Sequence, residues 1–225
     1  KKITEKEKKE KVKKDPNDST EYSLRLFVGT TVAGTYRTLE PNKNELFADS
    51  LGVRADEKSL TRWSFQLGFT SDINKSLMWE AGVAFMQNGE QYSFSATDTS
   101  HNYTSRYSWL GVPLKLYYKH DFNKLRLQVG AGVIPQMQMK FRREDTFLNR
   151  EGTNSTVETK TINGMNTFSI SAVGNIGLHY SITNRFGAFV QFEYRHQLMS
   201  SYLKTYPYIH KGTSIGANFG LTFGL

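Results

Sequence analysis

The sequence has no cysteine and no long hydrophobic run, and each absence excludes a class of structure. Without cysteine the chain can form neither disulfide bonds nor thiolate metal sites. No apolar run reaches the roughly 18 residues that a membrane-spanning helix needs. The first residues, KKITEKEKKEKVKK, also lack the apolar core of a signal peptide, so we expect a mature or trimmed chain, or a fragment of a longer one.

Acidic residues are outnumbered, and the positive excess is concentrated at one end. The formal net charge is +8, and Lys1–Lys14 carries eight lysines against three glutamates. A basic balance can indicate nucleic-acid binding, but no basic helix with base-reading side chains follows this segment, so we expect no nucleic-acid partner. The motif DPND at Asp15–Asp18 ends any helix here. We interpret residues 1–21 as a basic tail and residues 22–225 as one domain.

What the sequence does contain, from Tyr22 to its last residue, is an alternation of apolar and polar side chains. In TRWSFQLGFT, for example, every second residue is a large apolar one. Eight such stretches are strand candidates, and many have about the ten residues that a tilted strand needs to cross a bilayer. They cover residues 22–32, 61–70, 76–86, 108–119, 124–133, 167–182, 185–196 and 212–225.

The connections between these stretches alternate between short and long. The short ones are residues 71–75, 120–123 and 183–185, and the long ones are residues 34–60, 87–102, 142–166 and 199–211. This pattern predicts an all-β fold, an eight-stranded antiparallel up-and-down transmembrane β-barrel with short periplasmic turns and long extracellular loops. We therefore expect the bacterial outer membrane as its location, outer-membrane lipid and lipopolysaccharide around it, and both termini in the periplasm.

A soluble eight-stranded barrel with an apolar interior would show the same alternation. The polar face, however, combines charged residues with many glycines, while the apolar face is clean and has aromatic residues near the strand ends. Long loops also suit a membrane barrel better. We therefore place the polar face inside, where it should form a hydrogen-bonded network around two glutamates. The predicted inward charges are Arg25, Arg62, Glu80, Lys115, Arg126, Glu193 and Arg195.

The bore of an eight-stranded barrel is just wide enough to be filled by side chains. We therefore expect the inward charges to fill the lumen, and a gated pore or proton path is the alternative. The last residues, GTSIGANFGLTFGL, resemble the signal that the outer-membrane barrel assembly machinery recognises. The matching positions are Asn218, Gly220, Phe223 and Leu225, with leucine in place of the usual terminal phenylalanine.

The segment SWLGVPLKLYYKHDFNKLRLQVGAGVIPQM is the most specific in the chain. It resembles the strand, turn and strand of the PorT-type outer-membrane β-barrel family of the Bacteroidota, in which a YLxIPLxLKY strand precedes a VGAG strand. The resemblance extends over Tyr22–Leu225 and implies fold and location rather than chemistry. Pro113 removes a hydrogen-bond donor from the sheet, so we expect a bulge or an unpaired lumen-side position there. The matching residues are Trp109, Leu110, Val112, Pro113, Leu114, Leu116 and Tyr117, then Val129, Gly130, Ala131 and Gly132.

Candidate chemistry is sparse. His196 could be combined with Ser200, Ser201 or Glu193 as in a lipid-modifying barrel enzyme, although a surface histidine is the simpler interpretation. No two histidines have the spacing of metal ligands, so we expect no metal and no cofactor. The favoured function is a non-enzymatic membrane anchor or complex subunit that presents its loops and basic tail to a periplasmic or outer-membrane protein. The alternatives are the C-terminal barrel of an envelope-spanning regulator of the anti-sigma type, a lipid-modifying enzyme and a narrow porin.

Overall fold

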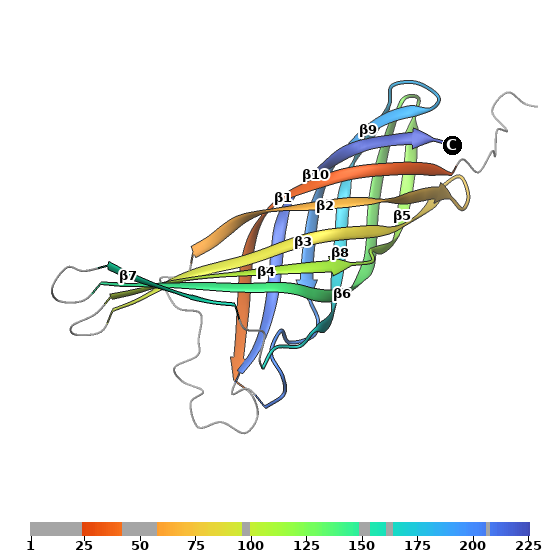
Figure 1. Ribbon diagram of the computed structural model, residues 1–225. Coiled ribbons are helices and arrows are strands. Elements are labelled where there is room, and N and C mark those ends of the chain that lie inside the picture. Colours follow the sequence, from red (N-terminus) through yellow and green to blue (C-terminus); the bar gives the residue numbers. More distant parts are fainter. Residues whose placement is uncertain (1–23, 42–57, 96–99, 149–153, 161–163, 206–207) are drawn as a thin grey trace, which may run out of the picture.

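The computed structural model describes residues 24–41, 58–95, 100–148, 154–160, 164–205 and 208–225 (Figure 1). Within these ranges, no helix is long and apolar enough to cross a membrane. The basic tail predicted at residues 1–21 lies outside the described residues. The described residues form ten strands: β1 (Arg25–Pro41), β2 (Lys58–Asp72), β3 (Leu77–Ser95), β4 (Ser100–Gly111), β5 (Leu114–Phe122), β6 (Leu125–Leu148), β7 (Asn154–Thr159), β8 (Phe168–Ser181), β9 (Phe186–Gln197) and β10 (Tyr208–Gly224).

The strands close into an antiparallel barrel. Strand β1 pairs with β2 on one side and with β10 on the other, so Arg25 lies beside both Thr70 and Gly224. From β10 the sheet continues through β9, β8 and β6 to β4 and β5, then to β3, which pairs with β2. Strands β4 and β5 lie in line between β3 and β6. They count as one wall strand, and β7 pairs with β6 alone among the described strands. Eight strands therefore form the wall, as the sequence predicts.

Side chains alternate across this wall as the sequence predicts, with the apolar face outward. Leu67 is 53% exposed, whereas its neighbour Gln66 is only 8% exposed. Exposed aromatic residues, among them Trp63 and Tyr118, lie toward the ends of the outer apolar face. The interior is predominantly polar, with a few large rings such as that of Tyr117. Such a surface is suited to contact with lipid rather than with water.

The prediction of long loops is partly wrong, because several strands continue far into the segments that were predicted as loops. Strand β6 has 24 residues and β3 has 19. At about 3.4 Å per residue, β6 is roughly 80 Å long, against about 30 Å of bilayer hydrocarbon. Strands β3, β4 and β6 run beyond the rest of the wall, and β7 joins them there (Figure 1). We call residues 90–95, 100–106, 142–148 and 154–159 the sheet extension. Outside the bilayer the outer face no longer needs to be apolar, so the alternation fades while backbone pairing continues.

Pro113 lies at the break between β4 and β5. Ala84 pairs with Gly111 and Ala81 pairs with Leu114, so the register with β3 is the same on both sides of the break. The register with β6 is likewise continuous. The side chain of Pro113 is fully buried inside the barrel. Of the two expectations for this residue, the lumen-side position is correct and the bulge is not. Its backbone is still partly paired, because its oxygen accepts from the backbone nitrogen of Gly82 at 3.2 Å.

Candidate functional site

The middle of the bore is occupied by a buried lysine between two carboxylates from opposite parts of the wall. The Nζ atom of Lys115, on β5, lies 2.9 Å from Glu80 Oε1 and 3.6 Å from Glu193 Oε2. Glu80 comes from β3 and Glu193 from β9, and all three side chains are buried. Because burying a single charge is costly, these three groups stabilise one another only as a set.

Neighbouring groups complete the hydrogen bonding of this central layer. The hydroxyl of Tyr117 donates to Glu80 Oε2 at 3.2 Å, and the amide nitrogen of Asn175 donates to Glu193 Oε2 at 3.1 Å. Tyr117 is completely buried, and its ring lies where a Cβ on Gly130 would be. Glycine at position 130 therefore makes room for the ring that holds Glu80.

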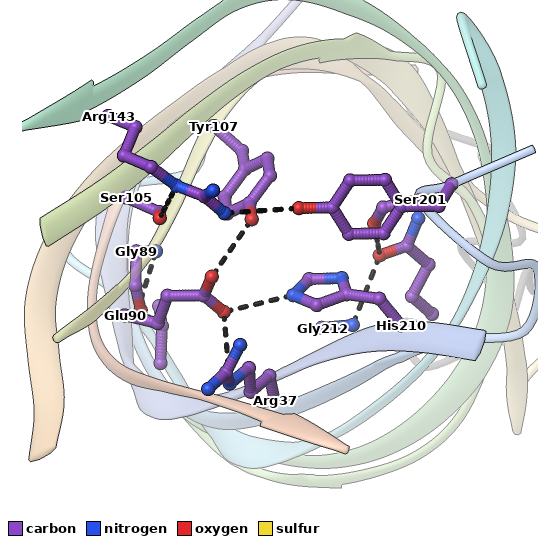
Figure 2. A network of polar contacts seen from close by, with 12 residues as sticks. Arg37, Gly89, Glu90, Ser105, Tyr107, Arg143, Ser201, His210 and Gly212 are labelled. Carbon is purple, nitrogen blue, oxygen red and sulfur yellow. Dashed lines mark hydrogen bonds and ion pairs between the residues drawn. The ribbon is translucent and has the colours of Figure 1, made fainter. Parts of the chain in front are cut away.

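A second network crosses the bore near the sheet extension, with Glu90 at its centre (Figure 2). Glu90 Oε2 accepts from His210 Nε2 at 2.9 Å and lies 3.5 Å from Arg37 Nε. Its other oxygen accepts from the hydroxyl of Tyr107 at 2.9 Å. The donors come from β10, β1 and β4, so one carboxylate connects three strands at the end of the barrel that carries the sheet extension. Glu90 itself is only 2% exposed.

This layer lies beyond the apolar band of the outer surface, since Glu90 is five residues past Phe85, the last of the described side chains of β3 that is large, apolar and exposed. Burial disfavours the charged form of Glu90, but the charges of His210 and Arg37 and the hydrogen bonds to His210 and Tyr107 together lower its pKa to about 2. Burial, reinforced by the charge of Glu90, raises the pKa of the Tyr107 hydroxyl well above its usual value. Glu90 is thus held as an anion, with Tyr107 as a neutral donor.

Further contacts join this network to the surrounding wall (Figure 2). Arg143 donates from Nε to Ser105 Oγ at 3.3 Å and from Nη2 to the hydroxyl of Tyr202 at 3.4 Å. Gln197 Oε1 accepts from Ser201 Oγ at 3.0 Å and from the backbone nitrogen of Gly212 at 3.1 Å. Between this layer and the central one lies a hollow of about 10 Å³, which is about the space of a single water molecule. The bore is therefore filled at two levels.

The structure places the seven predicted inward charges at different heights. Glu80, Lys115 and Glu193 meet in the central layer, and Arg195 lies beside them with its Nε donating to Ser214 Oγ at 3.1 Å. Arg62 is only half-buried, and it lies near the sheet extension, where a Cβ on Gly89 would meet its side chain. The other two predicted charges, Arg25 and Arg126, lie together at the opposite end of the barrel, near the short turns.

The sequence pattern places Glu90 and His210 in loops and does not predict their meeting. Both belong to strands, β3 and β10 respectively, and both side chains are buried. A signal is present in the sequence: QYSFS alternates polar and aromatic residues, and YTSRYSW has its aromatic residues at the first, fifth and seventh positions, which share one face of a strand. Alternation of that kind predicts strands that lie outside a bilayer, where the outward residues need not be apolar.

The residues considered for catalysis are not brought together. His196 is half-buried, and its Nδ1 is hydrogen-bonded to Thr213 Oγ1 at 2.8 Å. Glu193 is an odd number of residues away on the same strand and therefore faces the opposite side of the wall. Ser201 is engaged with Gln197. Within the described ranges, no three histidine, aspartate or glutamate side chains are grouped as metal ligands would be.

The four residues that resemble the assembly signal lie on β10 and just after it. Asn218 is buried and faces inward, whereas Phe223 and Leu225 are exposed on the outer face. Gly220 lies opposite Gly29 of β1, where the last strand closes against the first. A Cβ on Gly220 would collide with the backbone oxygen of Val28, so this closure needs glycine there.

An apolar outer band, a polar filled bore and a closed antiparallel wall define the class: an eight-stranded transmembrane β-barrel of the outer-membrane type. Among solved structures, the outer membrane protease OmpT from Escherichia coli is similar, with a TM-score of 0.52 and 7% identity over 90% of this chain and 97% of that one. Neisserial surface protein A (NspA) gives 0.46 and 13% over 90% and 97%. OprG from Pseudomonas aeruginosa gives 0.41 and 14% over 91% and 96%. At these identities the likeness shows the fold alone. No protein-family model and no curated protein matches the chain.

Proposed function

We infer that the protein is a non-enzymatic, non-conducting barrel of the bacterial outer membrane that anchors a binding surface. The observation that carries this proposal is the bore, which is crossed at two levels by buried charged groups, around Lys115 and around Glu90. Passage of an ion would require these pairs to separate inside a low-dielectric bore, which is costly. A barrel whose bore is filled in this way is suited to hold a binding surface rigidly and is not suited to conduct ions.

The sheet extension supports the anchor role. Strands β3, β4 and β6 continue past the apolar band and β7 adds to them there. Ion pairs join their outer surface, including Arg106 to Glu144 at 3.2 Å and Arg142 to Glu158 at 2.6 Å. Binding surfaces are commonly carried by segments that a rigid scaffold holds in place. The extension and its loops would face the cell exterior, and the basic tail would face the periplasm together with both termini. The partner would be a periplasmic or outer-membrane protein.

The finer assignments belong to the same proposal. Membership of the PorT-type family is supported by the segment from Trp109 to Gly132, and insertion by the barrel assembly machinery is supported by the terminal strand. Lipid and lipopolysaccharide would contact the outer apolar band. The protein would carry out no reaction, in keeping with the separation of His196 from Glu193 across the wall.

Conductance measurements test whether the barrel is closed. Wild-type protein in planar bilayers should show no stable open channel, because the central layer is complete. Replacing Glu80, Lys115 and Glu193 together by alanine removes that layer and should increase brief openings. Lys140→Ala, an exposed change on β6, is the matched control and should behave as wild type. A steady conductance from the wild-type protein would replace this proposal with the porin alternative.

A capture experiment tests which side of the anchor binds. Deleting residues 149–153, between β6 and β7, should leave periplasmic partners bound, because it removes no residue of either strand and loop closure depends weakly on length. Replacing the eight lysines of Lys1–Lys14 by glutamine should weaken capture in a salt-dependent way. Loss of partners only in the shortened variant would move the binding surface to the outside of the cell. Unchanged capture by both variants would exclude the anchor role.

A further inference from the structure

At the end where the three short turns lie, the bore widens into a hollow of about 1040 Å³. We call it the short-turn vestibule. Its mouth is formed by the turns between β2 and β3, between β5 and β6 and between β8 and β9. Its floor is formed by the first or last inward side chains of the wall strands, including Arg25 and His179. Neither of the two filled layers of the bore contributes to it.

Each of the three turns carries an asparagine followed directly by a cation, and all six residues line the vestibule. The turn segments are held by local hydrogen bonds: Asn74 Oδ1 accepts from the backbone nitrogens of Ser76 and Leu77, both at 2.8 Å. Thr183 Oγ1 accepts from the backbone nitrogen of Phe186 at 3.0 Å. Cations therefore lie on three sides of the mouth, one on each turn. The three pairs are Asn74 and Lys75, Asn123 and Lys124, and Asn184 and Arg185.

Deeper in the vestibule, two carboxylates are already neutralised. Lys119 Nζ lies 2.7 Å from Asp72 Oδ1, and Arg126 Nε lies 2.6 Å from Asp121 Oδ1. Arg126 also reaches Asp72, at 3.5 Å. The side chain of Arg25 forms no hydrogen bond or ion pair with any other residue that the structure describes, although the charges of Asp72 and Asp121 lie near enough to act on it. Six lysines and arginines against two aspartates line the hollow, so the excess is four positive charges.

The ring of His179 forms part of the floor. It is only 6% exposed, and its Nε2 is hydrogen-bonded to Thr222 Oγ1 at 2.8 Å. Its buried Nδ1 has no hydrogen-bond partner among the described residues. A Cβ on Gly187 would occupy the space of this ring, so the glycine permits its position. A buried ring nitrogen without a partner is costly. This nitrogen has almost no accessible surface, so the vestibule presents the ring of His179 to a ligand and not its Nδ1 atom.

We propose that the short-turn vestibule binds a small oxyanion of the phosphate class, with Arg25 and His179 at its floor and the turn cations at its mouth. The guanidinium fork of arginine matches the geometry of phosphate oxygens. The positive excess inside a walled hollow concentrates anions there. A folded protein domain does not fit within an eight-stranded bore. The phosphate group is supplied either by a lipid headgroup or by a soluble phosphorylated molecule.

The test is a calorimetric titration of inorganic pyrophosphate into the full-length protein in phosphatidylcholine nanodiscs. Arg25→Gln should weaken binding about tenfold or more, as expected for a lost charge-assisted hydrogen bond. Lys140→Gln removes the same charge from the exposed face of β6 and should change affinity by less than about threefold. Heat-modifiable migration in unheated gels confirms that each variant is folded. The absence of pyrophosphate binding to wild type, or equal losses in both variants, would overturn the proposal.

Two further arms identify the source of the phosphate. The first arm is native mass spectrometry of protein released from phosphatidylglycerol nanodiscs. If a lipid headgroup binds, the wild type should retain lipid and Arg25→Gln should retain less. If the ligand is soluble, the wild type and Arg25→Gln should be equally free of lipid. The acidic residues of the segment before β1 are the rival occupant within the chain. Neutralising Asp15, Asp18 and Glu21 by amide substitution should leave pyrophosphate affinity within about threefold. A large gain would show that this segment fills the vestibule, and would overturn the proposal.

Discussion

Removing the central lysine should be the most damaging single change in the bore. Lys115→Met keeps a similar volume but leaves Glu80 and Glu193 buried without their shared cation, whose Nζ lies 2.9 and 3.6 Å from their oxygens. Breaking a buried ion pair by removing one partner costs about 3–5 kcal/mol. We expect a loss of that size here, because Tyr117 and Asn175 supply hydrogen bonds but no positive charge.

The assay is equilibrium unfolding in urea from lipid vesicles at neutral pH, followed by tryptophan fluorescence. Lys140→Met on the exposed face is the control and should change stability by less than about 1 kcal/mol. The triple variant Lys115→Met, Glu80→Gln, Glu193→Gln removes all three charges and should recover most of the loss, because neutral groups can be buried at lower cost. If the triple variant is no more stable than Lys115→Met, the charge argument is wrong and packing around Lys115 dominates.

Three further outcomes follow from the same wall. Leu67→Arg should lower the free energy of unfolding in vesicles by about 2–4 kcal/mol, because it places a charge in lipid near the middle of β2. Gln66→Arg points into the bore and should cost less. The reverse order of the two losses would contradict the inside–outside assignment. Gly130→Val should cost about 1–3 kcal/mol through overlap with the ring of Tyr117, and unchanged stability would show that the ring can move aside freely. The pKa of Glu90 is lowered to about 2, so its contribution is complete above about pH 5 and is lost as the pH falls toward 2. The stability difference between wild type and Glu90→Gln should therefore narrow over that interval, and a constant difference would contradict a buried carboxylate anion.

The sequence was sufficient for the wall within the bilayer and insufficient beyond it. Inside the lipid, each outward position must be apolar, so the alternation of Gln66 and Leu67 reveals both the strand and its faces. Past the apolar band that constraint ends, and Glu90 and His210 were assigned to loops although they lie in strands. Backbone pairing alone leaves a weak trace in a single sequence.

A different reason explains why the sequence does not predict which inward charges meet. Glu80 and Glu193 meet at Lys115 only because β3, β5 and β9 have particular registers around the closed wall. Register and strand tilt together set the height of each inward side chain in the bore. Alternation gives the face on which a residue lies but not its position along the barrel axis. The sequence therefore groups Arg25 and Arg126 with charges that lie far from them along this axis.

The prolines on two neighbouring strands give the wall a mechanical weak point. Pro113 interrupts the line from β4 to β5, and in the continuous register Val112 lies beside Pro135 of β6, to whose oxygen it donates at 2.9 Å. Neither proline has a backbone N–H, so two adjacent ladders each lose a cross-strand hydrogen bond at the same height. A load applied to the sheet extension would therefore bend the wall here first. The half of the barrel nearer the short turns would keep its hydrogen bonds and stay inserted in the membrane while the half beyond the prolines deforms.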